Sequence, residues 1–257
     1  MEEICCRTWV IMQIIMEKEN EVYLRLSCEP GVKMELNHYF RFHPKDYQFM
    51  PMFRRRKWDG YVYLYNMDSG KIYYGLKNRI QRFASDREYK LIDQTNDSIE
   101  HISNEDYFKF LTSFPCEYKL RDYQNSAIRH SIDERRGVLL SPTASGKSLI
   151  IYYLVRYYFP QKSLIIVPTL SLVSQMYSDF ESYADKGFEV EKFVHKIFGG
   201  QEKVTDKPII ISTWQSLYDL KKDFFTDFEL VIGDEAHLYK AKSLTKIMKN
   251  LENAPYR

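Results

Sequence analysis

The chain has 257 residues, which is enough for two domains, and its formal net charge is only +2. Such a balance excludes a protein that binds nucleic acid through one global excess of basic residues. The 4 cysteines form no C-x-x-C pair, so no cysteine-held metal site is indicated. No apolar run is long enough for a membrane span, and the N-terminus lacks the features of a signal peptide. We expect a cytoplasmic, monomeric protein without membrane contact.

Residues 1–113 predict a small α+β domain. Alternating apolar residues indicate strands near 9–16, 21–27, 60–66 and 71–75. Helical periodicity indicates helices near 30–40, 75–87 and 104–112. Residues 92–106 are polar, and we interpret most of them as a loop.

Basic and aromatic residues are concentrated in the N-terminal domain. Between Arg41 and Lys90, twelve lysines and arginines stand against five acidic residues, and aromatic residues are interleaved with them. Basic side chains neutralise phosphates and aromatic rings stack on bases, so the region fits a DNA-binding surface. A solvated face over an aromatic core fits it equally well. One dense basic run favours DNA contact, and its members are Arg54, Arg55, Arg56 and Lys57.

Residues 114–257 predict a second domain with alternating strands and helices, the pattern of a parallel sheet covered on both faces. Strands are expected near 137–141, 163–167, 191–197, 208–212 and 229–233. Helices are expected near 121–134, 147–159, 170–185, 213–220 and 243–251.

A phosphate-binding loop is predicted where the first of these strands meets a helix. Residues 142–148 read P-T-A-S-G-K-S. Backbone N–H groups at a helix start are unpaired and attract phosphate oxygens. Lys147 is expected to reach the phosphates of ATP, and Ser148 is expected to ligate Mg²⁺. The remaining cradle residues are Thr143, Ala144, Ser145 and Gly146. Ser141 and Ala144 stand where related loops carry glycine.

Two acidic residues follow the last expected strand. Asp234 and Glu235 come directly after residues 229–233, and ligands of open α/β sheets bind outside the carboxyl ends of strands. We expect Asp234 to hold Mg²⁺ and Glu235 to take a proton from the attacking water. His237 is expected to sense the γ-phosphate.

Together these two motifs resemble those of superfamily 2 helicases, which implies a RecA-like ATP-binding lobe. Residues 118–124, Y-K-L-R-D-Y-Q, look like the adenine-recognition motif of that superfamily, which implies that Gln124 contacts adenine. Further segments look like its nucleic-acid-facing motifs and occur in the same order. They imply DNA contacts by Thr169, Gly199, Gly200, Thr213, Trp214 and Gln215. The resemblance also implies a second RecA-like lobe, absent from these 257 residues, so we expect little or no activity from this chain alone.

The N-terminal part is similar to the N-terminal domain of the UvsW family, the recombination and repair helicases of T-even bacteriophages. The matching residues are F-R-F at 40–42, F-R-x-x-x-W-D-G-x-x-x-L at 53–64, and Gly75 with Leu76. This similarity implies ATP-dependent unwinding of branched DNA, namely Holliday junctions, stalled forks and R-loops with RNA–DNA hybrids.

Two other functions fit parts of the sequence. One is the motor lobe of a restriction enzyme or another translocase that moves on duplex DNA without separating strands. A nuclease motif of the form P-D-x-(D/E)-x-K would favour it, and the sequence contains none. The other is a scaffold without catalysis, and the intact Lys147, Ser148, Asp234 and Glu235 argue against it. The choice between DNA and RNA, and the polarity of movement, stay open.

Overall fold

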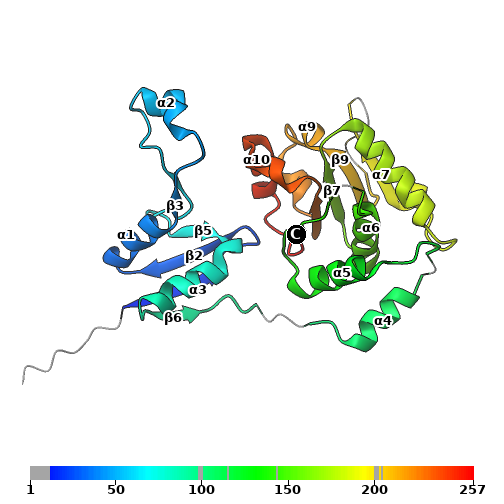
Figure 1. Ribbon diagram of the computed structural model, residues 1–257, viewed down its shortest axis with the longest axis horizontal. Helices are drawn as coiled ribbons and strands as arrows, with labels where there is room; N and C mark the ends of the chain where they lie inside the picture. The colour runs from blue at the N-terminus through cyan, green and yellow to red at the C-terminus, as the bar shows by residue number, and fades with distance from the viewer. Residues whose placement is uncertain (1–11, 98–100, 115, 143, 200–202, 204) are drawn as a thin grey trace, which may run out of the picture. The chain divides into compact units, whose positions relative to one another are not determined.

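Two four-stranded sheets organise the chain, one in each of its two units. The structure is a computed structural model that describes residues 12–97, 101–114, 116–142, 144–199, 203 and 205–257. The chain divides into Met1–Asp97 and Ser98–Arg257 (Figure 1), and each unit has a hydrophobic core of its own.

The first unit is an α+β domain. Its sheet has the order β5-β2-β1-β6 and consists of β1 (Gln13–Lys18), β2 (Tyr23–Cys28), β5 (Lys71–Tyr73) and β6 (Lys90–Asp93). Its long helices are α1 (Pro30–Tyr39) and α3 (Lys77–Asp86). Alternate strand residues point to the helices, because successive side chains of a strand face opposite sides. The core therefore contains Ile14, Met16, Leu24, Leu26, Val32, Leu36, Ile80 and Phe83.

A second, two-stranded sheet in this unit carries an excursion of the chain. Strand β3 (Arg41–Phe42) pairs antiparallel with β4 (Val62–Tyr63). Between them lie η1 (Tyr47–Phe49) and α2 (Pro51–Arg54), and Figure 1 shows α2 well clear of β1, β2 and β5. The sequence predicts neither β3 nor β6, and the strand expected at 60–66 is limited to β4. A short turn, η2 (Tyr74–Leu76), leads into α3.

The second unit contains a fully parallel sheet with the order β10-β7-β9-β8. Its strands are β7 (Ser163–Val167), β8 (Val194–Ile197), β9 (Ile209–Thr213) and β10 (Leu230–Gly233). Every residue of β7 is buried, because helices cover both faces of the sheet. This arrangement confirms the predicted α/β lobe.

The alternation of side chains along β7 assigns the helices to two layers. Ile165 and Val167 pack in the core formed with α5 (Asp122–Glu134), α6 (Lys147–Tyr158) and α7 (Leu170–Tyr183). Leu164 and Ile166 pack in the core formed with α9 (Trp214–Leu217) and α10 (Lys242–Asn250). Figure 1 shows these two groups of helices on opposite sides of the sheet. Shorter elements are α8 (Val190–Phe193), η3 (Lys222–Phe225) and η4 (Ala236–Lys240).

Helix α4 (Asn104–Thr112) belongs to the second unit. Tyr107 and Phe114 are buried in the same core as Ile128 and Tyr153, and Ser103 caps the helix by accepting a hydrogen bond from the Asp106 N–H. The domain boundary expected after residue 113 therefore differs from the observed division after Asp97. None of the described helices combines the length and the apolar composition that a membrane-spanning segment needs.

The strand expected at residues 137–141 is wrong. This segment has no regular structure, and Val138 and Leu140 are 70% and 95% exposed. The available edge of β10 is bonded elsewhere, since Tyr256 accepts a hydrogen bond from Val231 and donates one to Glu229. A strand forms only where its backbone groups find partners, so the apolar sequence alone does not secure this one.

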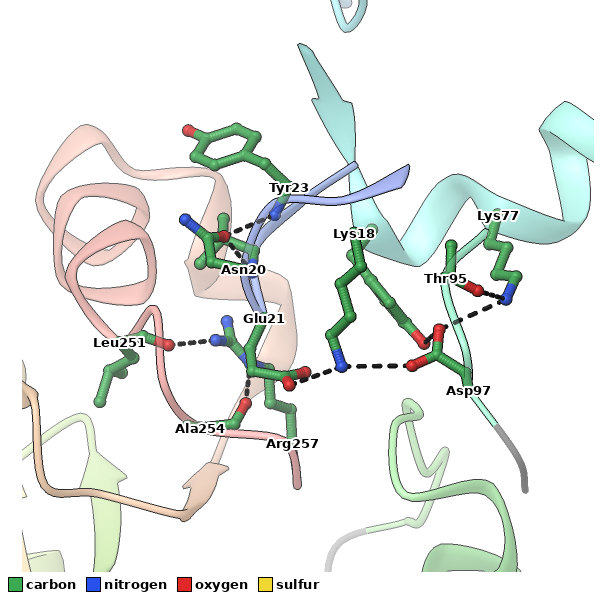
Figure 2. A network of polar contacts seen from close by, with 12 residues as sticks. Lys18, Asn20, Glu21, Tyr23, Lys77, Thr95, Asp97, Leu251, Ala254 and Arg257 are labelled. Carbon is green, nitrogen blue, oxygen red and sulfur yellow. Dashed lines mark hydrogen bonds and ion pairs between the residues drawn. The ribbon is translucent and has the colours of Figure 1, made fainter. Parts of the chain in front are cut away.

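A polar network closes the end of the first unit (Figure 2). The carboxylate of Asp97 lies 3.2 Å from Lys18 Nζ and 3.3 Å from Lys77 Nζ, and it accepts a hydrogen bond from Tyr74 Oη at 2.6 Å. Lys18 also pairs with Glu21 at 2.6 Å, and Lys77 donates to Thr95. These contacts join β1, α3 and the residues after β6.

Replacement of Asp97 tests this network. Burial raises the pKa of Asp97, but the hydrogen bonds from Tyr74 and Lys18 outweigh it and hold the pKa at about 2. Because the folded-state pKa is depressed, the stabilisation is present above pH ~4 and is lost as pH falls towards 2. We expect Asp97→Asn to destabilise the unit by about 2 kcal/mol at pH 7. The difference from the parent should shrink as pH falls from about 4, measured by denaturant unfolding. Asp86→Asn, an exposed control, should change little.

Candidate active site

The phosphate loop joins the irregular segment to the start of α6. Gly146 is the N-cap residue, with φ +74, and Ala144 has φ +62. Glycine adopts this left-handed region without a steric penalty and alanine does not, so the absence of glycine at 144 carries a local cost. Ser145 is buried, and its hydroxyl lies 2.5 Å from that of Ser141. Thr143, the other expected cradle residue, lies outside the described residues.

The start of α5 holds this loop in place. Gln124 Nε2 donates to the carbonyls of Ser145 and Gly146 at 3.1 and 3.3 Å, while its Oε1 accepts from the Arg121 N–H at 3.0 Å. Tyr123 Oη donates to the same Ser145 carbonyl at 2.7 Å. The amide of Gln124 is thus engaged within the chain at both ends. Its expected contact with adenine stays a prediction, and bracing the loop is the role that its contacts support.

Strand β10 delivers the two acidic residues to the loop. The Asp234 N–H continues the parallel pairing by donating to the Ile166 carbonyl, and Asp234 Oδ1 accepts from the Glu235 N–H at 3.0 Å. Glu235 has φ +55, which turns the chain sharply after the strand. Glu235 Oε1 lies 3.5 Å from Lys147 Nζ, and its Oε2 lies 3.2 Å from His237 Nδ1. The structure therefore brings the expected lysine, glutamate and histidine together.

Gly233 is needed where the strand meets this turn. A Cβ atom at Gly233 would collide with the ring and hydroxyl of Tyr239, so only glycine allows that ring to pack against the strand end. Burial raises the pKa of the Tyr239 phenol, which therefore stays neutral. Nothing in the sequence distinguishes Tyr239 from the chain's many other tyrosines.

The two expected magnesium ligands, Ser148 and Asp234, do not by themselves form a complete metal site. Ser148 Oγ lies 3.0 Å from Tyr183 Oη of α7, and the contacts of Asp234 are those already described. In the described residues, no group of three or more His, Cys, Asp or Glu side chains is positioned for a metal ion. This donor set fits Mg²⁺, which is commonly held by one or two carboxylates together with substrate phosphates. The assignment of Ser148 and Asp234 stays a prediction.

A cavity of about 370 Å³ lies beside this site. Lys147, Asp234, Glu235 and His237 line part of it, together with apolar residues of α6 and β10 and polar and charged residues at the end of α5. The exposed segment of residues 137–141 forms another wall. The site therefore combines charged groups with an apolar wall next to them.

A second hollow, of about 440 Å³, lies at the carboxyl ends of β7, β8 and β9. Four of the expected nucleic-acid residues line it, namely Thr169, Gly199, Thr213 and Gln215. Thr169 caps α7 by accepting from the Leu172 N–H at 3.3 Å, and Thr213 caps α9 by accepting from the Ser216 N–H at 3.4 Å. Lys203 also lines the hollow, and sequence reasoning missed it because a lone loop lysine carries no signal.

The remaining expected nucleic-acid residues differ in position. Trp214 is partly buried and packs against the core formed with α9 and α10, and its expected contact with DNA stays a prediction. Gly200 lies outside the described residues. Arg54, Arg55, Arg56 and Lys57 are all exposed in the first unit, and among the described residues none of the four is in an ion pair.

Comparisons with known proteins match both units. The family described as "DNA helicase UvsW, N-terminal" matches residues 14–93, and the family "Type III restriction enzyme, res subunit" matches residues 117–256. A crystal structure of the UvsW helicase from bacteriophage T4 is 31% identical and superimposes with a TM-score of 0.84 over 95% of this chain and 90% of that one. The chain belongs to the UvsW helicase family.

Two sequence relatives bear the names of proteins that act on DNA. The ATP-dependent DNA helicase uvsW of Enterobacteria phage T4 is 32% identical over 91% of this chain and 49% of its own length. The DNA 3'-5' translocase XPB2 of Sulfurisphaera tokodaii is 32% identical over 54% of this chain and 29% of its own length. The chain thus spans about half or less of the length of these relatives.

Lys147→Ala tests the phosphate loop. The Lys147 ammonium group forms an ion pair with Glu235. Removing this group would remove the charge-assisted hydrogen bond that it is expected to donate to phosphate. We expect ATP binding to fall by roughly 10- to 100-fold or more, measured by calorimetric titration. Lys192→Ala, which removes an exposed lysine paired with Glu189, is the matched control and should bind ATP normally. Unchanged affinity in the Lys147 variant would exclude this loop as the phosphate site.

Proposed function

We propose that this chain is the ATP-binding lobe and DNA-holding domain of a helicase that acts on branched DNA in the cytoplasm of the host cell. The substrates would be Holliday junctions, stalled forks and R-loops formed during recombination and repair. The observation that carries the proposal is the contact of Glu235 with both Lys147 and His237 at the carboxyl end of β10. The hollow lined by Thr169 and Thr213 opens at the carboxyl ends of the neighbouring strands, and this position supports the proposal that DNA lies there.

The proposed mechanism begins with the ion pair between Lys147 and Glu235. Phosphate oxygens compete for the Lys147 ammonium, since they carry more negative charge than one carboxylate. Glu235 is then left to accept a proton from the attacking water. His237 contacts the second oxygen of Glu235 and is placed to sense that change. Mg²⁺, held by Ser148 and Asp234, would neutralise charge on the phosphates.

We further propose that activity depends on a second RecA-like lobe. The relatives are about twice as long as this chain, which supports a further motor domain in the functional protein. Hydrolysis in such motors needs charges that stabilise the transferred phosphoryl group, and an arginine supplied by a second lobe is one source. On this proposal, the present chain binds ATP and DNA but turns over little ATP by itself.

A second candidate function has one observation in its favour. The restriction-enzyme family matches residues 117–256, more than half of the chain, and XPB2 is described as a translocase. A motor of this class would move along duplex DNA without separating the strands. The match to the N-terminal UvsW family at residues 14–93 favours the helicase.

Glu235→Gln separates ATP binding from hydrolysis. Glutamine has nearly the same shape but cannot accept the proton of water, so binding should persist while turnover falls by about 100-fold. The measurement is ATPase activity of the full-length protein with single-stranded, duplex or four-way-junction DNA, and the parent should respond most strongly to the junction. Glu189→Gln, which changes an exposed glutamate just before α8, is the control. Turnover within about threefold of the parent would show that Glu235 is not the base.

Replacing three arginines by alanine tests whether the first unit binds DNA. They are Arg54, Arg55 and Arg56. Removal of one basic side chain that binds a phosphate reduces the slope of log affinity against log salt concentration by about one. We expect the triple alanine variant to bind DNA more weakly with a flatter salt dependence, while ATP binding and sequence preference stay unchanged. A variant with Arg79, Arg82 and Lys90 replaced by alanine removes the same charge from exposed positions elsewhere in the unit. Equal effects of the two variants would mean that only net charge matters.

A further inference from the structure

The excursion between β3 and β4 has its own packing. We call residues 43–61 the arm. The His43 ring stacks between Tyr47 and Tyr61, with ring centres 4.0 and 3.8 Å apart, and Tyr47 meets Phe53 edge to face at 4.9 Å. His43 Nδ1 lies 2.8 Å from the Gly60 carbonyl. Gly60 has φ +86, and a Cβ atom there would lie 2.7 Å from the Tyr47 ring. This small aromatic core gives the arm a fixed shape.

The far end of the arm exposes large apolar side chains. Phe49, Met50 and Met52 are 66%, 38% and 53% exposed, although they lie within four residues of one another. We call these three residues the apolar tip. Because the aromatic core of the arm is filled by other rings, the tip contributes little to packing. Three neighbouring apolar side chains in water indicate a contact surface.

Strong positive charge surrounds the apolar tip. Residues 41–63 contain six lysines and arginines but only two aspartates. Asp59 is occupied by Tyr63 Oη at 2.5 Å and by the Tyr61 N–H at 3.0 Å, so it does not pair with the basic run. The Arg54 guanidinium lies 5.7 Å from the centre of the Phe49 ring. A partner must therefore present negative charge next to an apolar, flat surface.

A branch point in DNA has this combination. Along a continuous duplex the faces of the bases are covered by stacking, and a protein meets only phosphates and base edges. At a junction or fork, a terminal base pair has no neighbour on one side and exposes its flat face between two phosphate backbones. Aromatic and methionine side chains are suited to pack on that face, while arginines bind the flanking phosphates.

We propose that the apolar tip is a wedge that packs on the exposed base-pair face at a DNA branch point, with Arg54 and its neighbours on the adjoining phosphates. The inference rests on the proposed function, since it concerns the same DNA. It assigns the selection of branched over continuous DNA to Phe49, Met50 and Met52. The arginines supply affinity for either form.

The test compares a four-way junction with a linear duplex of equal length and base composition, without ATP. We expect Phe49→Ala combined with Met52→Ala to lower junction affinity by about tenfold, because stacking on a base is strong, and to leave duplex affinity within about twofold. Phe49→Trp should retain junction binding. Phe108→Ala is the matched control, since Phe108 is 67% exposed on α4, and it should bind both DNAs like the parent. Thermal unfolding should be the same for all variants.

Other results would overturn the wedge. They are an equal fall in junction and duplex affinity, no fall in either, or a parent that binds both DNAs equally. Reduced binding to anionic lipid vesicles with DNA binding intact would identify a membrane contact instead. Because no step depends on ATP, failure of the wedge is distinct from failure of the proposed helicase, which would appear as ATP turnover indifferent to DNA.

Discussion

Parallel pairing of β10, β7, β9 and β8 is the constraint on which the second unit depends. Parallel strands all end at the same edge of a sheet, so residues that are far apart in sequence meet there. The end of β10 supplies Asp234 and Glu235, and the ends of β7 and β9 lead to Thr169 and Thr213. One geometric rule therefore places the acidic residues and the helix caps along a common border. The buried run of β7 fixes the register that holds them there.

Much of the structure around the carboxyl edge of the sheet can be predicted from the sequence. The helix expected at 104–112 matches α4, and the strand at 163–167 matches β7, because both have clear signals: a serine cap in the first case and an unbroken apolar run in the second. The contact of Lys147 with Glu235 follows from motif order together with the parallel sheet. The fold class and the UvsW family resemblance are confirmed by the comparisons.

The structural features that cannot be predicted from the sequence depend on contacts between residues that are distant along the chain. Val138 and Leu140 have strand-like composition, yet the edge of β10 is bonded by Tyr256. The sequence also does not show that the Trp214 ring packs against the core formed with α9 and α10. Nor does it show that the Gln124 amide donates to the Ser145 and Gly146 carbonyls, because these residues lie far apart along the chain. Hydrogen-bond competition of this kind is decided only in three dimensions.

The close approach of Gln124 to Gly146 also limits how this sequence can diverge. A methyl group at 146 would lie 2.6 Å from Gln124 Nε2, and φ +74 adds a backbone penalty for any other residue. Shortening residue 124 would make room but would leave the Ser145 and Gly146 carbonyls without their donor. Neither position can therefore change alone without a penalty, and a change at 124 does not remove the backbone penalty at 146. The spacing of the loop thus couples the substitutions that the two positions can accept.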